Sequence, residues 1–330
     1  MSLADLPRVR LANLPTPLEE LPRFSAALGG PRIFIKRDDL TGLALGGNKA
    51  RKLEFLMADA LAKGADVVIT CGGGQSNHAR QTAAAAAKLG LKCVLLLSGS
   101  PDQPVQGNLL LDRLLGAETR FVKVEGLFGF DEAGAALVTE LRSQGHNPYF
   151  IPVGGSTTIG ASAYVAAVGE IAQQLRHMGQ KVSRLYIASG SAGTQAGTVL
   201  GAVYYQTGTE VIGVSVSSPR EALEASVLDL ANRTAAELGL GCEVTPAQVR
   251  VDDGYIGPGY ARLTPQGAEA IRLLAQTEGI ILDPVYTGKA MACLIDHVRR
   301  GVIGPDEAVL FLHTGGAAGL FAFAEELAGS

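Results

Sequence analysis

Glycine-rich loops that separate short apolar strands from helices constrain the fold of this chain more than any other feature. Residues 66–70 form a candidate strand, glycines occupy 72–74, residues 76–89 form an alanine-rich candidate helix, and residues 92–98 form a second strand. A strand, a helix and a strand within about 33 residues make a βαβ unit. Because both strands are almost continuously apolar, we expect a parallel sheet that helices cover on both faces.

The same pattern recurs in the second half of the chain. A candidate strand at 184–189 leads through a small-residue loop at 190–193 into a helix at 194–206 and a strand at 210–216. We therefore predict an α/β fold with two open, mostly parallel sheets and flanking helices. The remaining predicted elements are strands at 33–36 and 308–313 and helices at 49–63, 264–278 and 287–300.

Composition and charge argue against several classes of protein. The 330 residues suggest about two domains, and a net charge of −4 without a basic stripe argues against nucleic-acid binding. No apolar stretch of about 18 residues predicts a membrane span, and residues 1–10 do not resemble a secretory signal. The 4 cysteines are scattered without C-x-x-C spacing, so we expect no metal site and no disulfide framework. We accordingly expect a cytoplasmic protein.

The first candidate site is the segment Gly46-Gly47-Asn48-Lys49, which opens a predicted helix. The positive end of the helix dipole and burial would both favour the neutral form of the Lys49 amine. A neutral amine is what Schiff-base chemistry requires. The alternative is an ordinary surface lysine beside Arg51 and Lys52.

The second candidate site is the loop of Gly190, Ser191, Ala192, Gly193 and Thr194. Successive backbone N–H groups at a helix start bind anions, and small residues let a phosphate approach closely. No G-K-[ST] follows, which argues against a nucleotide P-loop, and no acidic residue follows the next strand, which argues against a dinucleotide. A cofactor monophosphate or a plain tight turn remains.

The third candidate site is Gln75-Ser76-Asn77-His78, between a strand and a helix. Serine and asparagine are good helix N-caps, and the same groups could bind a substrate carboxylate. Tyr260 and Tyr286 are further candidates, since a tyrosine ring can stack on a flat cofactor. Most of these candidate sites lie at strand-to-helix edges, where open α/β sheets bind ligands.

Six motifs carry a resemblance to a known family. They are I-K-R-D-D at 35–39, G-G-N-K-x-R-K-L-E at 46–54, Q-S-N-H-x-R-Q-T at 75–82, S-G-S-A-G-T at 189–194, L-D-P-V-Y-T-G-K at 282–289 and H-T-G-G at 313–316. With these motifs the chain resembles the D-cysteine desulfhydrase and 1-aminocyclopropane-1-carboxylate (ACC) deaminase family. That family belongs to the fold type II, or tryptophan-synthase-β-like, enzymes that depend on pyridoxal 5′-phosphate (PLP).

The resemblance implies a role for each matching residue. Catalytic roles fall to Lys49, which binds PLP covalently, and to Ser76, Tyr260 and Tyr286. The substrate is bound by Gln75, Ser76, Asn77, His78 and Tyr260. The other implied cofactor contacts are Asn48, Asn77 at the ring hydroxyl oxygen, Gly190, Ser191, Ala192, Gly193 and Thr194 at the phosphate, Tyr286 at the ring, Thr314 at the pyridine nitrogen, and Gly315.

The resemblance also implies a domain organisation and a reaction. A small domain, 51–161, would be inserted into a large PLP-binding domain, 1–50 and 162–330, and two chains would form a homodimer. The expected reaction is β-elimination from a small amino acid, with D-cysteine giving pyruvate, hydrogen sulfide and ammonia. L-Cysteate sulfo-lyase and ACC deaminase activity remain alternatives. From the residues alone, a dinucleotide-dependent reductase or a non-catalytic amino-acid sensor also remains open.

Overall fold

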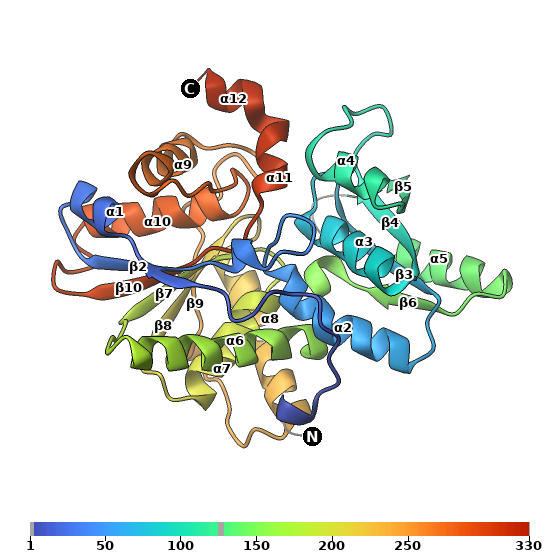
Figure 1. Cartoon of the computed structure of the whole chain (residues 1–330), viewed down its shortest axis with the longest axis horizontal. Helices are drawn as coiled ribbons and strands as arrows, with labels where there is room; N and C mark the ends of the chain where they lie inside the picture. The colour runs from blue at the N-terminus through green and yellow to red at the C-terminus, as the bar shows by residue number, and fades with distance from the viewer. Residues whose placement is uncertain (1–2, 125–128, 330) are drawn as a thin grey trace.

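The computed structural model describes residues 3–124 and 129–329, and it contains two β-sheets with helices packed around each (Figure 1). The strands are β1 (Leu18–Glu20), β2 (Arg32–Lys36), β3 (Val67–Gly73), β4 (Lys92–Ser98), β5 (Glu118–Val122), β6 (Pro148–Ile151), β7 (Arg184–Ser189), β8 (Glu210–Ser215), β9 (Arg250–Asp252) and β10 (Ala308–Leu312). The helices are α1 (Pro22–Ala27), α2 (Lys49–Ala62), α3 (Asn77–Leu89), α4 (Gly107–Leu114), α5 (Asp131–Ser143), α6 (Thr158–His177), α7 (Gly193–Tyr204), α8 (Arg220–Leu238), α9 (Pro265–Glu278), α10 (Thr287–Arg299), α11 (Ala317–Leu320) and α12 (Ala324–Ala328).

The larger sheet has six strands in the order β1-β2-β10-β7-β8-β9. Only the β1–β2 pair is antiparallel among these described strands. Apolar residues on one face pack against α6, α7 and α8, and those on the other face pack against α1, α9 and α10 (Figure 1). Since helices cover both faces, the strands can be apolar throughout, as the sequence predicts.

The smaller sheet is parallel and has four strands in the order β5-β4-β3-β6. Helices α2 and α3 pack on one face and α5 on the other. All four strands lie within residues 67–151, inside the segment that the family resemblance assigns to a small domain. The boundaries at 51 and 161 themselves stay a prediction.

Helix α2 is fixed to the larger sheet by a buried ion network. Arg51 binds the carboxylate of Asp38 through two nitrogens, each 2.8 Å from an oxygen, and it also binds Glu170. The hydroxyl of Tyr164 donates to Asp38 at 2.6 Å, and the amine of Lys36 donates to Glu170 at 2.5 Å. Because paired charges satisfy one another, this network can be buried, and it holds the start of α2 firmly in place.

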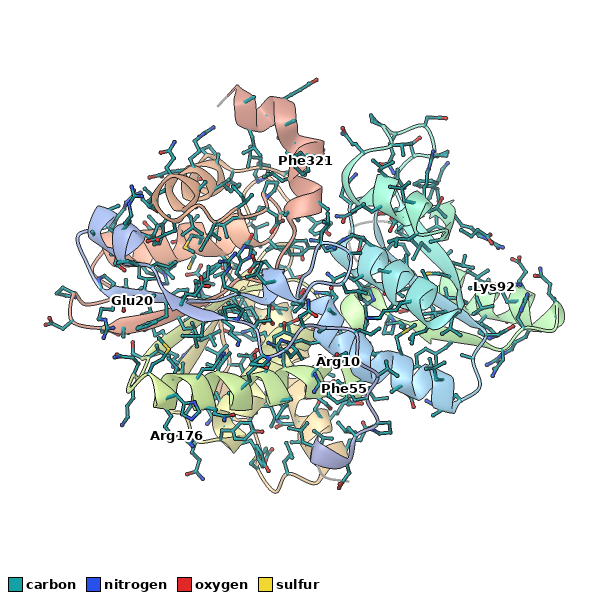
Figure 2. All side chains as sticks on the ribbon, in the orientation of Figure 1. Arg10, Glu20, Phe55, Lys92, Arg176 and Phe321 are labelled. Carbon is teal, nitrogen blue, oxygen red and sulfur yellow. The ribbon has the colours of Figure 1, made fainter. Side chains whose placement is uncertain are left out.

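The predicted α/β class is confirmed, and most predicted elements differ from the observed ones by one or two residues. The glycine run is the clearest difference, since Gly72 and Gly73 belong to β3 and pair with Leu97 and Ser98 of β4. Side chains fill the space between sheets and helices, while Phe321, before α12, is 67% exposed (Figure 2). Among the described residues, no helix is long and apolar enough to cross a membrane.

Candidate active site

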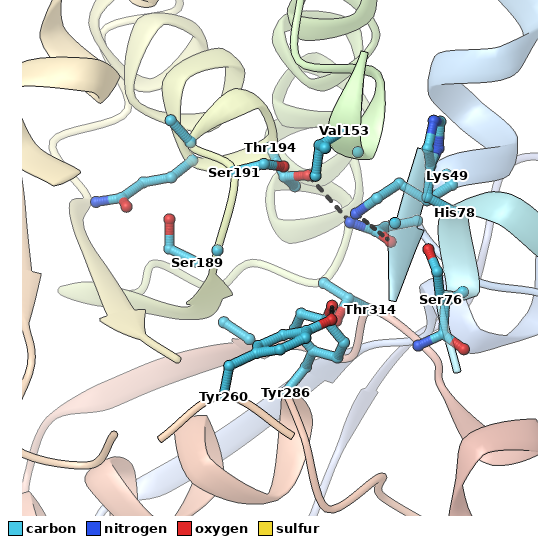
Figure 3. Close-up of a pocket in the computed structure, with 18 residues that line it drawn as sticks. Lys49, Ser76, His78, Val153, Ser189, Ser191, Thr194, Tyr260, Tyr286 and Thr314 are labelled. Atoms are coloured by element: carbon cyan, nitrogen blue, oxygen red, sulfur yellow. Dashed lines mark hydrogen bonds between the residues drawn. The ribbon is translucent and has the colours of Figure 1, made fainter. Parts of the chain in front are cut away.

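One pocket brings together most of the residues that the sequence singles out (Figure 3). It lies beyond the carboxyl ends of β3, β7 and β10, at the edge where open α/β sheets bind ligands. The lining residues are Asn48, Lys49, Gly72, Ser76, Asn77, His78, Val153, Gly154, Ala188, Ser189, Gly190, Ser191, Ala192, Thr194, Gln195, Tyr260, Tyr286 and Thr314.

Lys49 is the first residue of α2, and its amine faces the pocket. The Nζ atom donates to Asn48 Oδ1 at 3.3 Å, and Asn48 in turn donates to the hydroxyl of Thr194 at 3.0 Å. Burial lowers the pKa of Lys49 to about 8, which is the direction expected from the sequence. A substantial fraction of the amine is therefore neutral and able to attack a carbonyl carbon.

The loop between β7 and α7 forms a cradle of backbone groups and small side chains. Ala192 adopts a positive φ of 65°, and Gly193 begins α7. A Cβ atom on Gly193 would lie 2.6 Å from Ser156 Oγ and 2.8 Å from Lys52 Nζ, so only glycine fits here. Ser156 also donates to Ser191 at 2.9 Å. The cradle has the N–H groups and hydroxyls that suit a phosphate.

Lys52 is a site residue that the sequence argument missed. It is fully buried, and its amine donates to the carbonyl of Gly154 at 3.1 Å. Burial and the charge of Lys49 lower its pKa well below the usual value, so a nearby anion would stabilise its charged form. The signal was present in the sequence, because Lys49 and Lys52 are three residues apart and share one face of the helix. The alternative of an ordinary surface lysine at Lys49 does not fit the structure, because Lys49 lines the pocket and its neighbours Arg51 and Lys52 are both buried.

The start of α3 contributes further polar groups to the pocket lining. Ser76 caps the helix, since its hydroxyl accepts a hydrogen bond from the backbone of Ala79 at 3.1 Å. Asn77 accepts from the Asn108 side chain at 3.0 Å. His78 is only 3% exposed, and neither of its ring nitrogens has a hydrogen-bond partner in the described chain. Burial and the charges of Lys49 and Lys52 lower the pKa of His78, which keeps its ring neutral.

Unpartnered buried groups show that the pocket suits a polar ligand. Besides the two ring nitrogens of His78, the hydroxyl of Ser189 lines the pocket without a hydrogen-bond partner among the described residues. Buried polar groups are normally hydrogen-bonded, so these atoms would gain partners from a bound polar molecule. With the cradle and a reactive amine, they fit a compact phosphate-bearing aldehyde.

Two tyrosines close the pocket. The hydroxyl oxygens of Tyr260 and Tyr286 lie 2.5 Å apart, and their rings meet edge to face with centroids 6.0 Å apart. Burial raises the pKa of Tyr260 to about 12 and, with the neighbouring Tyr260, raises that of Tyr286 well above its usual value. Both phenols therefore keep their protons near neutral pH and can act as hydrogen-bond donors.

Some predicted residues lie outside the lining. Gln75 instead accepts from the backbone of Asn108 at 2.9 Å and donates to the carbonyl of Gln106 at 3.0 Å, so its side chain fastens α4. Gly315 allows close packing, since a Cβ there would meet Gly47 Cα at 2.7 Å. Gly193 lies between two lining residues of the cradle without lining the pocket itself.

Comparison with known proteins agrees with this geometry. Residues 9–315 match the model of the family described as pyridoxal-phosphate dependent enzymes. The chain belongs to this family, and PLP is its cofactor.

The most informative relatives are similar along almost their whole length. Proteins named D-cysteine desulfhydrase from Salmonella newport (strain SL254) and Salmonella heidelberg (strain SL476) are each 47% identical over 326 residues, which cover 97% of this chain and 97% of each relative. A solved structure described as an ACC deaminase homologue aligns with a TM-score of 0.92 and 43% identity, and the alignment covers 99% of this chain and 97% of that one. This likeness confirms the predicted fold type II architecture.

Proposed function

We propose that this chain is a lyase that removes the thiol from D-cysteine by β-elimination, giving pyruvate, hydrogen sulfide and ammonia. When PLP is bound, it takes up the electron pair that is left when the substrate Cα loses its proton. Lys49 would hold the cofactor covalently. The loop 190–194 and Lys52 would hold its phosphate. Asn48, Asn77 and Thr314 would contact its ring.

The remaining residues would bind the substrate and move protons. Ser76, Asn77 and His78 would orient the substrate carboxylate at the start of α3. For a D-amino acid, Ser76 is the proposed group that removes the Cα proton. Tyr260 and Tyr286 would donate a hydrogen bond or a proton to the departing sulfur from their paired hydroxyls at the pocket wall.

No carboxylate lines the pocket among the described residues, and the choice of β-elimination rests on this observation. Thr314 offers a neutral hydroxyl, and Thr287 is fully buried with its hydroxyl donating to Asp283 at 2.7 Å. The carboxylate of Asp283 also accepts backbone N–H groups of Val285, Tyr286 and Thr287, so it is not free to serve the cofactor. Without a carboxylate to keep the pyridine nitrogen protonated, the electron sink is weak, which suits a substrate with a good leaving group. The names of the Salmonella relatives support the same substrate.

The test is the ratio kcat/KM for D-cysteine, L-cysteine, L-cysteate and ACC. We expect D-cysteine to be preferred and ACC to be turned over poorly. Thr287→Glu combined with Thr314→Leu should raise the relative rate with ACC. Strong turnover of ACC by the unaltered protein would overturn the elimination argument. A preference for L-cysteate would change the substrate while leaving β-elimination in place.

The other classes of function are separated by absorption spectroscopy. A visible band of bound cofactor that none of these amino acids discharges would favour an amino-acid sensor. The dinucleotide-dependent reductase alternative does not fit, because the chain belongs to the family of pyridoxal-phosphate dependent enzymes. We further propose a cytoplasmic homodimer, which light scattering of the purified protein and fractionation of cells would test.

A further inference from the structure

Outside the candidate pocket, three side chains with metal-binding atoms converge on one point. Asp252 is the last residue of β9, and Cys293 and His297 lie one turn apart on α10. A carboxylate oxygen, the sulfur and a ring nitrogen of these residues all lie within 4.8 Å of one another. None of the three residues lines the candidate pocket.

The two separations from His297 Nε2 are close to those of ligands around a tetrahedral zinc ion. Asp252 Oδ2 lies 3.3 Å and Cys293 Sγ lies 3.8 Å from His297 Nε2. Zinc bonds of about 2.0–2.3 Å at tetrahedral angles place neighbouring ligand atoms roughly 3.3–3.7 Å apart. The three atoms could therefore bind one ion with only a small adjustment of the cysteine.

A hydrogen bond at the second ring nitrogen of His297 orients the ring for metal binding. His297 Nδ1 lies 2.8 Å from the hydroxyl of Tyr186, which is buried on β7. If Nδ1 donates to that hydroxyl, the lone pair of Nε2 points at the sulfur and the carboxylate. Metal-binding histidines are usually fixed in this way by a partner of the second nitrogen.

A Cys-His-Asp nucleophilic triad is a poorer interpretation of the same residues. Such a triad uses the two ring nitrogens separately, one for the nucleophile and one for the carboxylate. Here the sulfur and the carboxylate both face Nε2, while Nδ1 faces Tyr186. Three atoms that face one point are what ion binding requires.

We propose that Asp252, Cys293 and His297 bind a zinc ion. Water would be the fourth ligand, entering from a surface pocket lined by Asp252, Tyr255 and Asp296 among others. This proposal departs from the expectation of no metal site, which rested on cysteine spacing alone.

The ion would join β9 to α10 on both sides of a functional loop. Residues 253–259 connect β9 to Tyr260, and Lys289 of α10 already binds the carbonyls of Ile256 and Gly259 at 2.7 and 2.9 Å. Zinc at Asp252 would fix the beginning of this loop to the same helix. The role of the ion would be structural, since none of its three ligands lines the candidate pocket.

The test uses the PLP-loaded enzyme, stripped of metal with a chelator and then given zinc or cobalt alone. We expect about one zinc ion per chain by mass spectrometry after dialysis. Cobalt should give, in a difference spectrum against the same enzyme without metal, the bands of a tetrahedral ion and of a cobalt–thiolate bond. Absence of stoichiometric zinc, or cobalt bound without the thiolate band, would overturn the proposal.

Matched variants locate the ion. His297→Gln, Cys293→Ala and Asp252→Asn should each weaken zinc binding at least tenfold. Cys242→Ala and His146→Gln should bind zinc as the unaltered enzyme does, because Cys242 and His146 lie outside the cluster. Equal zinc binding by all five variants would contradict the assignment. The cobalt spectrum of the unaltered enzyme decides the question even if a ligand variant fails to fold.

Discussion

The hydroxyl oxygens of Tyr260 and Tyr286 lie 2.5 Å apart, so the two phenols share a hydrogen bond at the wall of the pocket. Tyr260 follows the loop after β9, whereas Tyr286 immediately precedes α10. Since one hydroxyl donates and the other accepts, the state of each proton depends on both residues. The two side chains should therefore act as one group.

Replacing either tyrosine tests this coupling. Tyr260→Phe and Tyr286→Phe should each lower kcat by roughly 10²–10⁴-fold, the usual effect of losing a general acid. The double variant should be little worse than the more impaired single variant, because either change breaks the shared bond. Steady-state rates with D-cysteine measure this, and losses that multiply would indicate that the hydroxyls act separately.

The lowered pKa of Lys49 predicts how covalent capture of PLP depends on pH. With a pKa of about 8, the reactive neutral amine becomes more abundant as pH rises and levels off above that value. An ordinary lysine, with a pKa near 10.4, would be only roughly 0.4% neutral at pH 8. We expect the rate of PLP capture by apoenzyme, followed by absorbance, to rise between about pH 6 and 9.

The covalent attachment of PLP to Lys49 can also be checked directly. Borohydride reduction followed by peptide mapping should find the pyridoxyl group on Lys49. Lys49→Arg should bind PLP without forming the bond. A pyridoxyl group on Lys36 or Lys52 would contradict the assignment, as would a capture rate that stays constant with pH.

The positions of Lys52 and Gly193 predict that both residues are needed to bind the phosphate of PLP. Lys52→Met should weaken PLP binding by about 10–100-fold, equivalent to roughly 1.5–3 kcal/mol for a charged hydrogen bond. Gly193→Asp should weaken it further, since a carboxylate would enter an anion cradle. Equilibrium dialysis measures both, with Lys63→Met, at the exposed end of the same helix, as the control. Unchanged affinity in both test variants would place the phosphate elsewhere.

Ser76 has two roles that a matched control separates. Ser76→Ala should retain the cofactor band but lower kcat by roughly 10²–10⁴-fold, because it removes the proposed proton acceptor. It also removes a helix cap, which costs about 1 kcal/mol. Thr157 caps α6 in the same way, accepting from Gly160 at 3.1 Å, but does not line the pocket. Thr157→Ala should lose similar stability and keep its kcat, and a normal kcat in Ser76→Ala would remove Ser76 from proton transfer.

The buried network around Asp38 predicts a large effect on stability. Asp38→Asn leaves two buried cations, Arg51 and Lys36, to share the single carboxylate of Glu170, which should lower the free energy of unfolding by about 3–5 kcal/mol. Glu20→Gln, which breaks an exposed pair with Arg32, should lower it by less than about 1 kcal/mol. Denaturant unfolding of the PLP-loaded protein measures both, and similar small effects would contradict the role of the network.

The network also predicts a dependence on acid. Burial alone would raise the pKa of Asp38, but the charge and hydrogen bonds of Arg51 hold it below its usual value. The resulting stability is present above the unfolded-state pKa near 3.9 and is lost as pH falls through the folded-state value. Asp38→Asn should therefore lose less stability than the unaltered protein does on acidification below about pH 4.

The sequence predicts local features of the site well because they depend on neighbouring residues. The paired glycines before Lys49 and the small residues at 190–194 mark the starts of α2 and α7, and the structure brings Lys49, Gly190, Ser191, Ala192 and Thr194 into one pocket. Long motifs also identify the family, which a single short loop could not do.

Features that depend on tertiary contacts were not predictable in the same way. The side chain of Gln75 turns to α4, although it lies beside Ser76 in the sequence. Lys52 shares a helix face with Lys49, but its burial depends on tertiary contacts of its amine with the carbonyl of Gly154 and with Gly193. Asp252, Cys293 and His297 are separated by up to 45 residues, counting from 252 to 297, and only the contact between β9 and α10 joins them.

The order of the strands has a consequence for biosynthesis. β10 lies between β2 and β7 in the larger sheet, yet it follows every other strand in the described chain. The ribosome must therefore translate almost the whole chain before that sheet can close, whereas the strands of the smaller sheet come from residues 67–151. We expect nascent chains arrested near residue 300 to protect the smaller sheet from protease while remaining unable to retain PLP.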